Sequence, residues 1–348
     1  MSNVLFRGNT YQYLNKYCKK IAFSKVIVVV DENTSKICLP VFENLVTFDF
    51  DYIEIKPGEA YKNMISVQNI WQKLIDLEVD RNSLIINLGG GVVTDMGGFA
   101  ALTYKRGLPY INIPTTLLGM VDAAIGGKTG VDFNGLKNQI GVIQEPLLVG
   151  IDPVYLKTLP QRECLSGMGE VYKYGFMADA KLYQTLQSYK DTYPSDEVIK
   201  RCVNIKKNIV SQDLTEQGVR KTLNFGHTLG HAIESYFLTK PEAQQLRHGE
   251  AVAIGMIMAL YLSHVKTGLP EEVCREGQLL LKSRFSTPQL SDEDQKHIIT
   301  YLKHDKKNRH DTLQFVLLKN IGQAVWNITV TTDEVYQAFE NYQRLLYT

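Results

Sequence analysis

The sequence predicts an α/β domain built on a parallel sheet, followed by a mainly helical domain. In residues 1–152, short apolar runs rich in β-branched residues alternate with segments of helical spacing, which is typical of a doubly wound sheet. From about residue 153 to the end, helical spacing dominates. The chain has 348 residues, of which 44% are hydrophobic, so each part is long enough to bury its own core.

The elements of the first domain follow from their residues. The continuous β-branched run within residues 25–31 indicates a strand that is buried on both faces. Residues 48–56 alternate between polar and apolar side chains, which predicts a second strand. Apolar residues recur at helical spacing from Ser66 to Val79. Further strands are expected at residues 84–88, 110–113 and 147–150.

The second domain is expected to contain a series of helices and one short strand. Apolar residues recur at helical spacing in residues 164–176, 180–189, 195–212, 222–237, 248–266, 271–284, 292–304 and 332–345. Gly268 and Pro270 separate two of these helices. Only residues 313–318 have the composition of a strand.

Charge and cysteine pattern narrow the classes of function. The formal net charge is +1, so no general affinity for nucleic acid or a membrane surface is expected. The five cysteines are scattered and form no CxxC pair, which is typical of reduced thiols. The N-terminus lacks a signal-peptide pattern, and no apolar run reaches the roughly eighteen residues of a membrane span. We therefore expect a soluble cytoplasmic protein.

A glycine loop follows the strand predicted at residues 84–88. Gly89–Gly91 would let backbone N–H groups approach a pyrophosphate at the N-terminus of the next helix. Thr94 stands where the dinucleotide fingerprint GxGxxG has its last glycine, while Gly97 and Gly98 supply small residues for helix packing. The loop is therefore either a nucleotide site or a tight strand-to-helix turn.

Residues 122–141 combine five glycines with Asp122, Lys128, Lys137 and Asn138. Glycine-rich backbone with isolated lysines is one way in which proteins hold phosphate. The alternative is a solvated loop whose lysines have no function. Apolar residues around the glycines indicate a partly buried segment, which favours the phosphate site.

Three histidines lie close together in the second half. His227 and His231 are four residues apart and would share one helix face, and His248 opens the next predicted helix. Imidazoles with one carboxylate and an open coordination position form a catalytic zinc site. Glu170, with Lys173 one turn later, is a plausible source of the carboxylate. Spacing alone favours His227 and His231 as the metal pair.

These motifs resemble the dehydroquinate synthase family of sugar phosphate cyclases over nearly the whole chain. The similar segments include residues 57–62, 89–95, 121–130, 136–141, 223–234 and 246–256. The departures are Thr94 in place of glycine, Ala123 and Ala124 in place of serines, and Gly169 in place of alanine. The resemblance implies a Rossmann-like NAD-binding domain at 1–152 and a helical metal- and substrate-binding domain at 153–348, with the active site between them.

The resemblance also implies which residues form the site. Zinc or cobalt would be held by Glu170, His227 and His248, which leaves the His231 imidazole unligated for proton transfer to the substrate. The residues implied to contact NAD are Asp31, Glu32, Asn33, Glu59, Ala60, Tyr61, Lys62, Gly90, Gly91, Val92, Asp95, Thr115, Thr116, Lys128, Lys137, Tyr155, Leu156, Lys157 and Thr158. Those implied to act on the substrate are His231, Glu216 as a proton acceptor, Lys173, Lys128, Asn138, Arg106, Asp122, Lys206, Arg220, Asn224 and one of Lys306 or Lys307.

The implied reaction converts 3-deoxy-D-arabino-heptulosonate 7-phosphate to 3-dehydroquinate and phosphate, the second step of the shikimate pathway, in a homodimeric lyase. NAD oxidises a hydroxyl group, phosphate is eliminated, the hydride returns, and an intramolecular aldol closes the ring. Lysines and Asn138 suit the phosphate, while Arg220 and Lys206 suit the substrate carboxylate.

Three alternatives to this reaction were open. Arg220, Lys206 and Asn224 argue against a cyclase whose substrate lacks a carboxylate, since the buried cationic pair would then lack its anion. The lysines of residues 121–141 argue against an alcohol dehydrogenase that releases NADH. A catalytically inactive interaction protein would be expected to have lost one of the three implied metal ligands.

Overall fold

The computed structural model describes residues 3–134, 136–189, 191, 193–303 and 313–347. The chain divides into two compact units. The first contains Met1–Pro160 together with Lys206–Ser211, and the second contains Gln161–Ile205 and Gln212–Thr348. The boundary predicted from the sequence lies at residues 152–153, a few residues before this division. None of the helices that the structure describes has the length and apolar composition to cross a bilayer.

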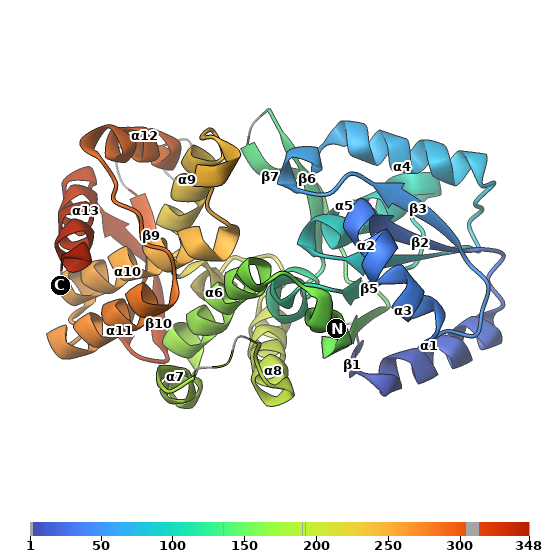
Figure 1. The fold of residues 1–348 in the computed structure, drawn as a ribbon, viewed down its shortest axis with the longest axis horizontal. Coiled ribbons are helices and arrows are strands. Elements are labelled where there is room, and N and C mark those ends of the chain that lie inside the picture. The colour runs from blue at the N-terminus through green and yellow to red at the C-terminus, as the bar shows by residue number, and fades with distance from the viewer. Residues whose placement is uncertain (1–2, 135, 190, 192, 304–312, 348) are drawn as a thin grey trace. The chain divides into compact units, whose positions relative to one another are not determined.

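The first unit is built on a six-stranded parallel sheet (Figure 1). Its strand order is β1-β8-β5-β4-β2-β3. The strands are β1 (Asn3–Phe6), β2 (Val26–Asp31), β3 (Asp51–Ile55), β4 (Leu84–Gly89), β5 (Tyr110–Pro114) and β8 (Leu148–Ile151). Every residue of β4 and β5 is buried, as expected for parallel strands covered on both faces. The predicted parallel-sheet domain is therefore confirmed.

Helices cover both faces of this sheet. They are α1 (Gly8–Ile21), α2 (Glu32–Ile37), α3 (Leu39–Glu43), α4 (Met64–Asp76) and α5 (Gly91–Thr103). On one face, alternate β2 residues Ile27 and Val29 pack with α4 and α5 in a single apolar core. Tyr11 of α1 contacts Phe42 of α3, with their ring centroids 6.4 Å apart. In Figure 1, α4 lies on one side of the sheet and α1 on the other.

An antiparallel hairpin, β6 (Lys128–Phe133) and β7 (Leu136–Ile143), occupies the glycine-rich stretch that carries the predicted phosphate groups. Gly130 pairs with Gly141, and a Cβ on Gly141 would lie 2.0 Å from the Thr129 carbonyl oxygen. Two of the glycines therefore allow the hairpin strands to approach closely. Gly126 and Gly127, which precede β6, are buried, as the apolar context predicted.

The second unit is mainly helical, as predicted. Its helices are α6 (Gln161–Ala178), α7 (Ala180–Gln187), most of α8 (Asp196–Gln212), α9 (His227–Phe237), α10 (His248–Thr267), α11 (Glu271–Arg284), α12 (Asp292–Lys303) and α13 (Thr332–Leu346). Helix α10 is buried along most of its length, and α6, α9, α11 and α13 pack around it. An apolar helix with no polar face has to be surrounded in this way.

Two predictions for this unit were wrong in detail. Residues 222–237 do not form one helix, because Gly226 adopts φ 76° and separates a 3₁₀ turn at Val219–Asn224 from α9. Residues 313–318 are not the only strand, since β9 (Leu313–Asn320) pairs with β10 (Gln323–Val330) in an antiparallel hairpin. The alternation in β10 is weak, which is why its sequence did not reveal a strand.

Candidate active site

The glycine loop lies at the carboxyl end of β4 and opens α5. Gly90 is the N-cap of α5, and a Cβ there would lie 3.0 Å from Thr116 Cγ2. A Cβ on Gly91 would lie 3.1 Å from the Ala123 Cβ. Only glycine keeps this helix N-terminus open, which fits a bound pyrophosphate. The N–H of Thr115 donates to Gly89 O at 3.0 Å, so the predicted threonines lie beside the loop.

The glycines that follow confirm the predicted helix packing. A Cβ on Gly97 would lie 2.0 Å from Asn87 Oδ1 in β4, and one on Gly98 would lie 2.6 Å from Thr129 Cγ2. Thr94, which replaces the last glycine of the fingerprint, is buried within α5. Gly97 and Gly98 therefore allow the close packing of α5 that the last glycine of the fingerprint usually allows.

Lys62 connects predicted cofactor and substrate residues. Its Nζ donates to Asp95 Oδ2 and to Asn138 Oδ1, each at 2.7 Å, and the lysine is 4% exposed. Burial lowers the pKa of Lys62, but Asp95 and Glu59 outweigh this effect and raise it above its ordinary value. The lysine is therefore charged. Because an ammonium only donates, it also fixes which end of the Asn138 amide faces it.

Two further pairs of predicted residues meet in the first unit. Lys206 Nζ donates to Asp122 Oδ1 and to the Asp122 carbonyl oxygen, each at 2.6 Å. Lys137 Nζ lies 3.2 Å from Glu59 Oε1. The 3₁₀ turn at Pro153–Thr158 holds the predicted NAD segment, where the Tyr155 hydroxyl accepts from Tyr11 at 3.0 Å.

Among the other predicted residues of this unit, one caps a helix and two are exposed. Asp31 Oδ1 accepts from the N–H groups of Asn33 and Thr34, and so caps α2. Arg106 is exposed and has a φ of 72° at the end of a 3₁₀ turn. Lys128 begins β6 and is exposed. The structure alone thus assigns no ligand to these residues.

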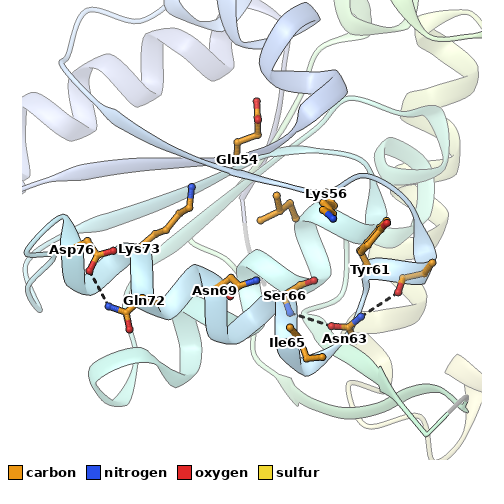
Figure 2. Close-up of a pocket in the computed structure, with 12 residues that line it drawn as sticks. Glu54, Lys56, Tyr61, Asn63, Ile65, Ser66, Asn69, Gln72, Lys73 and Asp76 are labelled. Atoms are coloured by element: carbon orange, nitrogen blue, oxygen red, sulfur yellow. Dashed lines mark hydrogen bonds between the residues drawn. The ribbon is translucent and has the colours of Figure 1, made fainter.

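A hollow of about 580 Å³ lies beside β3, and residues along the whole length of α4 line it (Figure 2). Ala60 and Tyr61, both implied to contact NAD, lie in its wall. Asn63 caps α4 there by accepting from the Ser66 N–H at 3.1 Å. The lining also includes Glu54, Lys56, Lys73 and Asp76. The lining therefore carries charged side chains of both signs.

The three histidines of the second unit form one cluster. Their ring centroids are 5.1 Å apart for His227 and His231, 5.5 Å for His227 and His248, and 5.8 Å for His231 and His248. Glu170 Oε1 lies 3.3 Å from His227 Nε2 and 3.0 Å from His248 Nε2. One ligand atom from each of these three residues lies within 4.8 Å of the others. Two imidazoles and one carboxylate suit a catalytic zinc ion, so the donor set fits a divalent metal.

Close helix packing brings these side chains together. Gly169 precedes Glu170 in α6, and Gly249 follows His248 in α10. A Cβ on Gly249 would lie 1.8 Å from the Ser166 carbonyl oxygen, and one on Gly169 would lie 2.8 Å from Gly249 Cα. The backbones of α6 and α10 therefore touch beside the two ligands.

Charges around Glu170 keep it ionised. Burial raises the pKa of Glu170, but Lys173 and then His227 outweigh burial and hold the pKa well below its ordinary value. Lys173 forms an ion pair with Glu170 Oε2, and both side chains are almost fully buried. An ionised carboxylate is the form that binds a cation.

Three more predicted residues of the second unit form hydrogen bonds within the chain. Asn224 Nδ2 donates to Glu216 Oε1 at 2.5 Å, which joins a predicted substrate contact to the predicted proton acceptor. Arg220 is 2% exposed, and its Nη1 donates to the Leu214 carbonyl oxygen at 2.6 Å. Lys306 and Lys307 lie outside the described residues.

Sequence reasoning missed Glu234. It lies on α9 at positions i+7 from His227 and i+3 from His231, so all three share one helix face. His248 Nδ1 lies 3.2 Å from Glu234 Oε2. His231, Glu234 and His248 also form a group whose ligand atoms lie within 4.8 Å of one another. Helical spacing was the signal that could have found this residue.

The chain is similar to proteins of known activity. The family model of the 3-dehydroquinate synthase N-terminal domain matches residues 52–166, and that of the C-terminal domain matches residues 167–308. A 3-dehydroquinate synthase of Parabacteroides distasonis is 38% identical over 335 residues, which are 95% of this chain and 94% of the relative.

Two solved structures share the fold over nearly the full length. ValA, a 2-epi-5-epi-valiolone synthase from Streptomyces hygroscopicus with NAD+ and Zn2+ bound, has a TM-score of 0.84 and 28% identity, covering 99% of this chain and 97% of that one. A 2-deoxy-scyllo-inosose synthase complexed with carbaglucose-6-phosphate, NAD+ and Co2+ has a TM-score of 0.83 and 25% identity, covering 98% and 96%.

Proposed function

The chain belongs to the 3-dehydroquinate synthase family, and we propose that it acts as a carbon–oxygen lyase on 3-deoxy-D-arabino-heptulosonate 7-phosphate, releasing phosphate and 3-dehydroquinate. The observation that carries this proposal is the convergence of Glu170, His227 and His248 in the second unit. The similar structures with NAD+ and Zn2+ or Co2+ support the same cofactors for this chain.

We assign the metal to Glu170, His227 and His248. When bound, a divalent ion there would act as a Lewis acid on a substrate oxygen. Two of these ligands also contact other groups of the chain. Lys173 forms an ion pair with Glu170 Oε2, and the Phe225 carbonyl oxygen lies 3.1 Å from His227 Nδ1. His231 lies beside the ligands, and an imidazole outside the ligand set can transfer a proton to or from the substrate.

We assign NAD to the open N-terminus of α5 and the segments implied by the resemblance. When bound, NAD would take a hydride from a substrate carbon and later return it, so none is consumed. Lys62 holds Asp95 of α5 and Asn138 of β7 by direct hydrogen bonds. The same lysine thus orders a cofactor residue and a predicted phosphate residue.

The two ends of the substrate are assigned to different residues. Lys128 and Asn138 suit the phosphate, and Arg220 with Lys206 suits the carboxylate. The carboxylate is what distinguishes this substrate from those of carboxylate-free cyclases. Asp122 orients Lys206 through two hydrogen bonds, so Lys206 is held in place before any substrate arrives. Assembly as a homodimer stays a prediction from the resemblance, which sedimentation of the full chain can check.

One assay tests the proposal against its rivals. The metal-loaded full chain would be given NAD and the heptulosonate phosphate, and released phosphate and NADH absorbance would be followed together. We expect phosphate release without net NADH. Stoichiometric NADH would instead identify a dehydrogenase, and turnover of a hexose phosphate alone would identify a different cyclase.

A further inference from the structure

The imidazole of His248 has a different partner on each nitrogen. Nε2 lies 3.0 Å from Glu170 Oε1, on the side where the metal is proposed. Nδ1 lies 3.2 Å from Glu234 Oε2. An imidazole can offer a lone pair at Nε2 only when its remaining proton is on Nδ1. A carboxylate facing Nδ1 favours that tautomer, since it accepts the Nδ1–H bond.

Glu234 is shielded from solvent and lies within contact distance of His248. The residue is 6% exposed, and α9 fixes its backbone on the same face as His227 and His231. The His248 side chain is 22% exposed, and His248 is the first residue of α10. The two ring nitrogens face the Glu234 and Glu170 carboxylates, so both carboxylates favour this orientation of the His248 ring.

The other two ligands have partners of the same kind. His227 Nδ1 lies 3.1 Å from the Phe225 carbonyl oxygen. Glu170 Oε2 is paired with Lys173. Each proposed ligand thus has one atom available for the ion and a second atom in contact with another residue of the chain. Outer partners of this kind orient a ligand and typically change metal affinity 10–100-fold when removed.

We propose that Glu234 is a positioning residue that holds His248 in the orientation and tautomer needed for metal binding. This inference rests on the proposed metal site. A rival explanation uses the same atoms: His231, Glu234 and His248 could hold a second ion, because their ligand atoms also lie within 4.8 Å of one another. That arrangement would require His248 to bridge two cations with both nitrogens, so the proton on Nδ1 would be lost. Counting ions separates the two.

The test compares Glu234→Ala, Glu234→Gln and wild type as full chains loaded with Co2+. Metal per chain, affinity against a chromophoric chelator, and the visible spectrum of Co2+ would be measured. We expect one ion per wild-type chain, affinity roughly 10–100-fold weaker in Glu234→Ala with an altered spectrum, and a smaller loss in Glu234→Gln, which keeps an acceptor oxygen. Glu334→Gln, another hydrogen-bonded glutamate of the second unit, is the matched control and should bind as wild type.

Each other result has a definite meaning. Unchanged affinity and spectrum in both Glu234 variants would overturn the positioning role while leaving the metal site intact. Two ions in wild type and one in Glu234→Ala would make Glu234 a ligand instead. Lower unfolding stability of the metal-free variants with unchanged affinity would mean a purely structural role. A wild-type chain that holds no ion would overturn the proposed metal site itself, and the inference with it.

Discussion

Lys206 Nζ lies 2.6 Å from Asp122 Oδ1, and it donates to the Asp122 carbonyl oxygen at the same distance. The two side chains are 7% and 21% exposed. A cation assigned to the substrate carboxylate is therefore paired with an acid of its own chain. The pair presets the position of Lys206.

Removing only the acid should be more harmful than removing both partners. We expect Asp122→Ala to destabilise the chain by about 2 kcal/mol, because it leaves a buried ammonium without its carboxylate. Combining Asp122→Ala with Lys206→Met should cost less than the sum of these two single changes. Urea unfolding of the full chain measures this, and Lys207→Met, a lysine on the same helix, is the control. Strict additivity would contradict the coupling.

The histidine cluster predicts which variants lose metal. His227→Ala and His248→Ala should each leave well under one ion per chain after dialysis, because the ion keeps too few anchors. His231→Ala should keep its metal and lose about 10²–10⁴-fold in turnover, as expected for a proton-transfer group. Metal analysis with an activity assay checks both. A metal-free His231→Ala beside a fully loaded His227→Ala would favour the spacing argument over the resemblance.

The contact between α6 and α10 predicts an unusual sensitivity to one methyl group. Gly249→Ala should cost about 3 kcal/mol and most of the metal affinity, since its Cβ would lie 1.8 Å from a backbone oxygen. Gly169→Ala should cost less, because the nearest atom is 2.8 Å away and the helices can shift slightly. Thermal unfolding and metal titration give the readouts. Gly8→Ala, where no atom lies within 4 Å, serves as the control.

Lys62 predicts a joint effect on cofactor and phosphate. Lys62→Met should weaken both NAD binding and inhibition by inorganic phosphate about tenfold, because Asp95 and Asn138 each lose a charged hydrogen bond. Calorimetric titration of NAD and phosphate inhibition constants measure the two effects. Lys16→Met, an exposed lysine on α1, is the control and should change neither. If Lys62→Met weakened only NAD binding or only phosphate inhibition, Lys62 would not be the group that orders both Asp95 and Asn138.

Asp294, which is not part of the proposed metal site, predicts a pH dependence of stability. Burial raises the pKa of Asp294, but hydrogen bonds from Ser291 and Tyr236 lower it to about 2, against 3.8 ordinarily. Because the folded pKa is depressed, the stabilisation is present above pH 3.8 and is lost as the pH falls toward 2.

Asp294→Asn should therefore cost about 1–2 kcal/mol at pH 7, and its difference from wild type should shrink as the pH approaches about 3. Urea unfolding at several pH values measures this difference. Asp292→Asn, an exposed residue on the same turn, is the control. A difference that does not change with pH would show that the carboxylate charge is not responsible.

The sequence determined those helices and strands that form because of a pattern within their own residues. The β-branched run in β2 and the apolar spacing of α4 and α10 predicted strand and helices because side-chain alternation and helical periodicity repeat within a few residues. The sequence could not show that Gly226 breaks the helix expected at 222–237. A distant residue also requires glycine there, since Met256 Cγ would lie 2.4 Å from a Cβ at this position. Pairing of β10 with β9 likewise depends on a partner strand.

The sequence by itself also determined the family and the kinds of group at the site, because residue type decides which atoms can bind a metal, hold a phosphate or move a proton. Only the tertiary structure decided which groups meet. His227 and His231 share a helix face by spacing alone, but Glu170 arrives from α6 and His248 from α10. The contact between Glu234 of α9 and His248 of α10 likewise depends on how these two helices pack. The period of one helix orients its own side chains, whereas distances between helices are set by close packing of residues far apart in the chain.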